Sequence, residues 1–337
     1  MNRRLIRNAA LLNDGQKCGV DLLFAQRYDE GERLRSPQWR AVVRQAGGRA
    51  PDPPMPWKRS WMRACSQAIG GSLLVGWVSI CLASEPMHIE LPSAVEQGSL
   101  VVGTAKNAQR IRLGDRWLRL DAEGRFVFGV GRDQLNSLHL QAFEATGVER
   151  RFEIKVKPRE WPTERVNGVA QETVTPSPAM AERIAREQAS VALARQRDDA
   201  RSDFASTYQW PVIGRISGVF GSQRIYNGEP RSPHSGLDVA AATGTLLRAP
   251  AGGVVTFAKH DLYLTGGTVL LDHGHGVSSV FLHLSRIDVA LGQRVEAGHA
   301  LGAVGATGRA SGPHMHWGLN WFDVRLDPSL LPGIKAQ

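Results

Sequence analysis

Cysteine is nearly absent from this chain of 337 residues, and its few copies all lie near the amino terminus. The three cysteines are Cys18, Cys65 and Cys81, so the last 256 residues contain none. A fold built from those residues needs no disulfides and carries no free thiol, which suits an oxidising compartment.

Net positive charge is also small in most of the chain. The formal net charge is +9, but residues 1–83 hold 13 Lys+Arg and 6 Asp+Glu, which accounts for +7 of it. The remaining 254 residues are nearly neutral, and they contain no RNA- or DNA-binding motif. We therefore expect no nucleic-acid partner.

A long uninterrupted apolar run is missing too. The most apolar stretch, Ala64–Leu82, is broken by three glycines and is short for a membrane-spanning helix. The basic segment Met55–Arg63 precedes it, and the small-x-small sequence Cys81-Leu82-Ala83 ends it. This order is typical of a secretory signal peptide over 55–83, with a membrane anchor as the alternative. We expect export to the periplasm or cell envelope, and only transient membrane contact through the leader.

Residues 1–54 stand before that leader, although a signal peptide normally begins a translated chain. They are mixed in charge, show no clear periodicity and end in a proline-rich stretch. We hypothesise that translation starts at Met55 or Met62, and that residues 1–54 are not part of the mature protein.

Short alternating runs separated by turn signals fill residues 84–157. They predict strands near 99–103, 110–113, 117–120, 125–128, 138–143 and 151–156. Even spacing of this kind favours a small all-β, sandwich-like domain, in which we identify no catalytic set. Residues 158–209 follow as a proline-rich linker, with one helix predicted over about 178–200 because helix formers dominate there.

Glycine and β-branched residues dominate residues 210–332, and no helix is predicted there. Runs at 253–257, 268–271, 278–284 and 300–304 predict an antiparallel β-sheet core. The fold class is therefore mainly β: a sandwich-like N-terminal domain and an antiparallel C-terminal sheet, joined by the linker and one helix.

Histidines in this C-terminal part have the spacing of a metal site. His234 and Asp238 lie four residues apart, and His314 and His316 lie two apart. Residues at even spacing share one face of an extended strand, so each pair can point at one place. Two imidazoles and a carboxylate, with one position left open, form a catalytic zinc site.

The region resembles the lysostaphin-type, LytM-like zinc metallopeptidases that cleave peptidoglycan. The pattern of that family is a histidine, three residues and an aspartate, then an aromatic-x-histidine-leucine strand, then a histidine-x-histidine. This chain has these parts in order as His234 to Asp238, Phe281 to Leu284, and His314 to His316, with Gly312-Pro313 just before the last.

The resemblance implies residue roles. It implies one Zn²⁺ per catalytic domain, held by His234, Asp238 and His316. His314 is then the general base, and His283 stabilises the developing oxyanion or positions the water. The implied activity is endopeptidase cleavage of cross-links between peptidoglycan peptide stems. In a Gram-negative periplasm that bond is the D-alanyl link to diaminopimelate.

Strand alternation adds two predictions about neighbouring residues. Phe281 and His283 are expected to share an exposed working face, with Leu282 and Leu284 on a buried apolar face. The sequence His273-Gly-His-Gly276 predicts a hairpin turn, and a second metal site is the alternative there.

Two other functions stay open at this stage. Some proteins of the resembled family have lost zinc ligands and activate other wall hydrolases, although the ligand set here is complete. The segments 249–255 and 295–301 also resemble hairpins of biotinyl and lipoyl carriers, for which Lys259 is the nearby lysine. The oligomeric state is not predicted.

Overall fold

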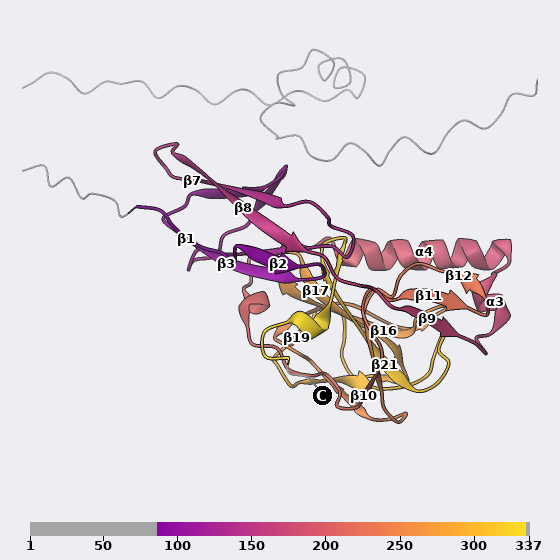
Figure 1. Ribbon diagram of the computed structural model, residues 1–337. Helices are drawn as coiled ribbons and strands as arrows, with labels where there is room; N and C mark the ends of the chain where they lie inside the picture. Colours follow the sequence, from indigo (N-terminus) through magenta and orange to yellow (C-terminus); the bar gives the residue numbers. More distant parts are fainter. Residues whose placement is uncertain (1–85, 335–337) are drawn as a thin grey trace, which may run out of the picture. The chain divides into compact units, whose positions relative to one another are not determined.

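The computed structural model describes residues 86–334 (Figure 1). The upstream segment 1–54 and the expected leader 55–83 lie outside the described residues. Strands dominate what is described, which confirms the mainly β fold class. Within the described range, no helix is long and apolar enough to cross a membrane.

The N-terminal part contains two antiparallel-rich sheets whose inner faces meet. One sheet has the order β1 (His88–Glu90), β3 (Leu100–Lys106), β6 (Arg125–Gly129). The other has the order β2 (Ala94–Glu96), β8 (Glu149–Lys157), β7 (Leu138–Phe143), β4 (Arg110–Leu113), β5 (Arg116–Leu118). Fully buried side chains from both sheets share one apolar cluster: Ile111, Phe126, Phe128, Leu140 and Ile154. The predicted strands are all present, and the arrangement is sandwich-like.

The C-terminal part is built on an antiparallel sheet. The order of its strands is β10 (Arg215–Gly218), β13 (Leu237–Ala240), β21 (His314–Trp321), β17 (Val277–Leu284), β16 (Gly266–Gly274), β15 (Gly253–Leu262), β19 (Arg294–Val295). Strand β22 (Val324–Leu326) also pairs with β21. A smaller sheet contains β14 (Leu246–Arg248), β20 (Ala300–Ala303) and β18 (Arg286–Ile287). Two 3₁₀ turns, η1 (Asp203–Ala205) and η2 (Pro328–Leu330), complete it. The predicted antiparallel sheet is confirmed.

The segment between these two parts contains a strand and a short helix before the predicted helix. Strand β9 (Thr163–Val166) runs parallel to β11 (Gln223–Tyr226), which also pairs with β12 (Glu229–Pro230). The short helix α3 (Gln171–Val174) follows β9. Strand β9 was not predicted, because its partner is some 60 residues away and four residues carry little periodicity of their own.

Helix α4 (Pro178–Ala194) is the predicted helix, and it ends earlier than the expected residue 200. Its N-cap is Ser177, whose hydroxyl accepts a hydrogen bond from the Met180 amide. Val191 and Ala194 pack on a small apolar cluster of Phe257, Leu262, Leu270 and Val280. The helix therefore covers part of one sheet face.

Strand β17 contradicts the predicted assignment of faces. Its register places Phe281 opposite Trp317 and Leu282 opposite His316, and directly opposed residues share a face. Phe281 is fully buried against Trp317, so it does not lie on an exposed working face with His283. His283 has a left-handed backbone (φ 64°), which interrupts the two-residue alternation. This kink turns the His283 ring toward His314 and His316.

Candidate metal centre and its cleft

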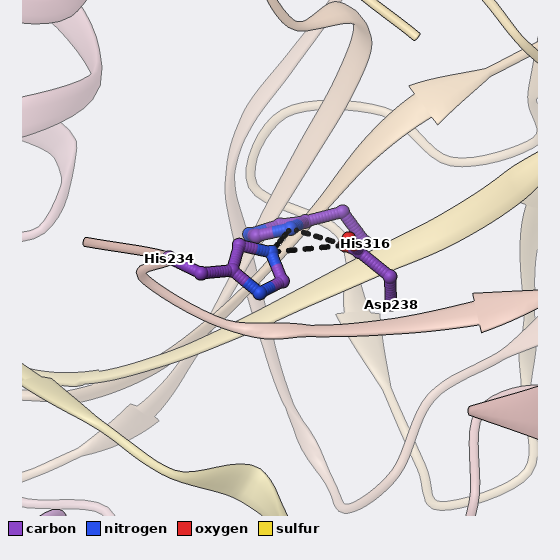
Figure 2. A group of neighbouring side chains, drawn as sticks. All are labelled: His234, Asp238 and His316. Atoms are coloured by element: carbon purple, nitrogen blue, oxygen red, sulfur yellow. Dashed lines mark hydrogen bonds and ion pairs between the residues drawn. The ribbon is translucent and has the colours of Figure 1, made fainter. Parts of the chain in front are cut away.

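Three side chains that the sequence predicted as a group converge beside the paired strands β13 and β21 (Figure 2). The Asp238 Oδ1 atom lies 3.1 Å from His234 Nε2 and 2.9 Å from His316 Nδ1. The two imidazole nitrogens are 3.0 Å apart. All three residues are buried.

Local backbone geometry explains how they meet. The strand register places Asp238 directly opposite His316. His234 lies before β13, so it does not share a strand face with Asp238, as the spacing in the sequence had suggested. The turn through Ser235-Gly236 brings His234 to the group instead. A Cβ atom at Gly236 would lie 2.6 Å from His316 Nε2, so only glycine leaves room for that ring.

Hydrogen bonds set the orientation of the ligand candidates. His234 Nδ1 donates to the Val219 carbonyl at 3.0 Å, which leaves the Nε2 lone pair facing the group. Burial lowers the pKa of His316 to about 4. Burial opposes ionisation of Asp238, but the neighbouring His234 and His316 imidazoles outweigh this effect and hold the pKa of that carboxyl well below its usual value. An ionised Asp238 and a neutral His316 are the forms that metal binding needs.

The donor set fits zinc. A tetrahedral zinc ion with bonds of about 2.0–2.2 Å keeps its ligand atoms about 3.3–3.6 Å apart. The three candidate atoms are separated by 2.9, 3.0 and 3.1 Å, so a small movement outward gives that spacing. Two nitrogens and one oxygen also match the ligand types of a catalytic zinc site, with a fourth position left open.

The other two predicted histidines stand beside this group. The rings of His283 and His314 are 4.8 Å apart between centroids, and His314 Nε2 is 3.9 Å from Asp238 Oδ1. His283 Nδ1 donates to the Thr307 carbonyl at 2.7 Å, and His314 Nδ1 donates to the Gly312 carbonyl at 2.8 Å. Burial, and then the charges of the neighbouring histidines, lower the pKa of His283 to about 3. Each ring is held by its backbone acceptor, so Nε2 stays available for chemistry.

These residues lie in a cleft of about 1380 Å³ that is rich in arginine. Seven arginines line it: Arg132, Arg195, Arg215, Arg224, Arg231, Arg309 and Arg325. Within the described part of the chain, only Arg132 and Arg224 of these form ion pairs with a carboxylate. Four carboxylates, Asp133, Glu164, Glu187 and Asp238, also line the cleft, so the seven arginines leave an excess of positive charge that favours an anionic ligand.

The second histidine pair has a different place. His273 is fully buried, donates from Nδ1 to the Gly252 carbonyl at 2.7 Å, and lies 2.9 Å from the Ser279 hydroxyl through Nε2. His275 and Gly276 both have positive φ and form the turn from β16 to β17, which confirms the predicted hairpin. Within residues 86–334, the His234 group is the one cluster of three or more His, Cys, Asp or Glu side chains with the spacing of a metal site. Lys259 lies within β15 instead of in a turn, unlike the modifiable lysine of a carrier domain.

Comparison with known proteins agrees with this geometry. The model of peptidase family M23 matches residues 232–328. Peptidoglycan DD-endopeptidase ShyA of Vibrio cholerae is 39% identical over 106 residues, which are 31% of this chain and 24% of that protein. DD-carboxypeptidase/endopeptidase Mpg of Neisseria meningitidis is 40% identical over 107 residues, 32% of this chain and 24% of that protein. The chain thus spans about a quarter of the length of these curated relatives.

A solved structure extends the likeness beyond the matched region. A protein from Pseudomonas aeruginosa assigned to peptidase M23 is 33% identical, with a TM-score of 0.53. The alignment covers 71% of this chain and 95% of that one. Together with the domain match, this similarity shows that the chain belongs to peptidase family M23.

Proposed function

We propose that this chain is an exported, zinc-dependent peptidoglycan endopeptidase. The observation that carries the proposal is the convergence of all five predicted side chains at one place in the cleft: His234, Asp238, His316, His283 and His314. A protein that had lost its activity would have no need to keep both the ligands and the accessory histidines.

Each residue has a role that its surroundings support. His234, Asp238 and His316 would hold one Zn²⁺, which when bound polarises a peptide carbonyl and lowers the pKa of water. His314, fixed through Nδ1, would accept the proton of the attacking water at Nε2 and pass it to the leaving amine. His283, neutral at physiological pH, would donate a hydrogen bond to the developing oxyanion or position the water. Because His283 donates from Nδ1 to the Thr307 carbonyl, its Nε2 carries a lone pair, so His283 would act through a water molecule that it orients.

The substrate is proposed from the relatives and from the charge of the cleft. The relatives in Vibrio and Neisseria are DD-endopeptidases by name, and the former acts on peptidoglycan. Peptide stems of peptidoglycan carry free carboxylates, and the cleft is lined by five arginines that form no ion pair within residues 86–334: Arg195, Arg215, Arg231, Arg309 and Arg325. We infer that the bond cut is the D-alanyl cross-link to diaminopimelate in a periplasm or cell envelope. A catalytically silent activator of other wall hydrolases is the alternative.

Digestion of purified sacculi tests the proposal. The protein beginning at Ser84 should release uncross-linked muropeptides, identified by mass spectrometry, and a zinc chelator should stop the release. Asp238→Ala should lose most of its zinc and all of the release. Sacculi left intact by a zinc-loaded protein would favour the activator. Amino-terminal sequencing of exported protein should begin near Ser84, whereas a chain that retains Cys65 and Cys81 would indicate an anchor.

A further inference from the structure

The two oxygens of the Asp238 carboxylate have different partners. Oδ1 faces His234 and His316 at 3.1 and 2.9 Å, whereas Oδ2 accepts a hydrogen bond from Arg224 Nη2 at 2.9 Å. Arg224 is only 8% exposed, so little solvent competes with this bond. Because Oδ2 is held, the carboxylate presents a single oxygen to the ligand group.

A glycine on β10 leaves the space for this pair. A Cβ atom at Gly218 would lie 2.5 Å from Arg224 Nη2 and 2.5 Å from Asp238 Oδ2. Gly218 is opposite Asp238 in the register, beside an irregularity in the pairing of β10 with β13. Any side chain at this position would push the guanidinium off the carboxylate.

Arg224 is in turn held from the linker. Strand β9 places Glu164 directly beside Arg224 on β11, and Glu164 Oε2 lies 3.2 Å from Arg224 Nε. The other carboxylate oxygen, Oε1, accepts a hydrogen bond from the Val219 amide at 3.2 Å. The carbonyl of that same Val219 accepts a hydrogen bond from His234 Nδ1. One linker side chain is therefore connected to two of the three ligand candidates.

We propose that Arg224 and Glu164 are positioning residues of the metal site. Strand β9, which supplies Glu164, is then part of the catalytic domain. Arg224 keeps Asp238 monodentate, and Glu164 fixes both Arg224 and the backbone that orients His234. This inference rests on the proposed function only for the identity of the metal. Residues that bond to metal ligands without binding the metal themselves typically contribute about 10–100-fold to metal affinity or activity.

The test measures zinc affinity of the full chain without substrate, by competition with a chromophoric chelator. Arg224→Gln should weaken zinc binding about 10–100-fold. Glu164→Gln, which keeps the size of the side chain, should weaken it by a smaller factor. Gly218→Ala should act in the same direction as Arg224→Gln, because the added methyl group displaces the guanidinium. Arg224→Lys should lose less zinc affinity than Arg224→Gln, because lysine keeps the positive charge but not the simultaneous contact with Asp238 and Glu164.

A spectrum and a matched control separate positioning from general stability. In the Co²⁺-substituted protein, Arg224→Gln should change the visible absorption, because Asp238 becomes free to bind through both oxygens. Arg165→Gln is the control: Arg165 is the neighbour of Glu164 on β9, is exposed and touches no ligand. It should keep the zinc affinity and the spectrum of the unmodified chain. Thermal unfolding of the metal-free variants shows which of them fold.

The outcomes are distinct. Unchanged zinc affinity and an unchanged cobalt spectrum in Glu164→Gln and in a folded Arg224→Gln would overturn the inference. Equal losses in Arg165→Gln would also overturn it, because the effect would then be one of β9 as a whole. If zinc binds as expected and sacculi stay intact, the proposed function fails while the inference stands. A chain that binds no zinc at all refutes both.

Discussion

The chain contains two histidine-x-histidine pairs that have the same spacing but different structural surroundings. On β21, His314 and His316 lie next to β13 and β17, which supply Asp238 and His283. In the other pair, His273 lies within β16 and is fully buried, and His275 occupies a left-handed position in the turn that follows. Two-residue spacing places the two rings of a pair on one side of a strand, and the neighbouring strands decide whether further ligand candidates meet them there.

The largest expected effect comes from removing a ligand. His316→Ala should empty the metal site and abolish muropeptide release, because the two protein ligands that remain do not hold the ion. Zinc content by atomic absorption, measured beside the release rate, checks this. A His316→Ala protein with full zinc occupancy would show that the residue is not a ligand.

The next effect separates chemistry from metal binding within the reactive pair. His314→Ala should keep its zinc and lose about 10²–10⁴-fold in rate, as expected for a general base. His283→Ala should also keep zinc and lose about 10²–10³-fold, as expected for an oxyanion donor. Zinc content and release rate are measured for both variants. If His314→Ala lost the metal while His316→Ala kept it, the two assignments would be reversed.

A smaller effect concerns the buried member of the other pair. Burial lowers the pKa of His273 to about 4, whereas the unfolded chain titrates near its ordinary value. The stability from keeping this ring neutral is therefore fully present above about pH 6.5 and is lost as the pH falls toward about 4. His273→Asn should make the free energy of unfolding depend less on pH, by about 2 kcal/mol between pH 7 and pH 5.

Urea unfolding at both pH values, with metal removed by a chelator, measures this difference. The other histidines titrate in both proteins, so the comparison isolates His273. Equal pH dependence in the two proteins would show that His273 is not a neutral core residue.

The smallest effect is expected at the turn. His275 has φ 49°, a backbone conformation that asparagine adopts at least as readily. His275→Asn should leave zinc content and release rate unchanged and should lower the stability by about 1 kcal/mol, because the buried His275 ring packs against Phe204. A loss of zinc in this variant would contradict the contrast between the two pairs and would point to a metal role for the turn.

Sequence reasoning was strongest where chemistry is local. Strand alternation and turn residues predicted six strands of the N-terminal part and four of the C-terminal part, and the ordered histidines and aspartate predicted the group that the structure brings together. The glycine-flanked pair at 273–276 predicted its hairpin because positive φ is a property of single residues.

Long-range contact decided the rest. Strand β9 forms because β11 offers its edge, and the buried place of Phe281 follows from its register against Trp317. Arg224 has no spacing that links it to Asp238, fourteen residues later, yet folding brings its guanidinium to 2.9 Å from the carboxylate. The sequence by itself determined which side chains can bind a metal, since that depends on their chemistry. Only the tertiary structure decided which groups hold them in place, since those contacts exist only between strands distant along the chain.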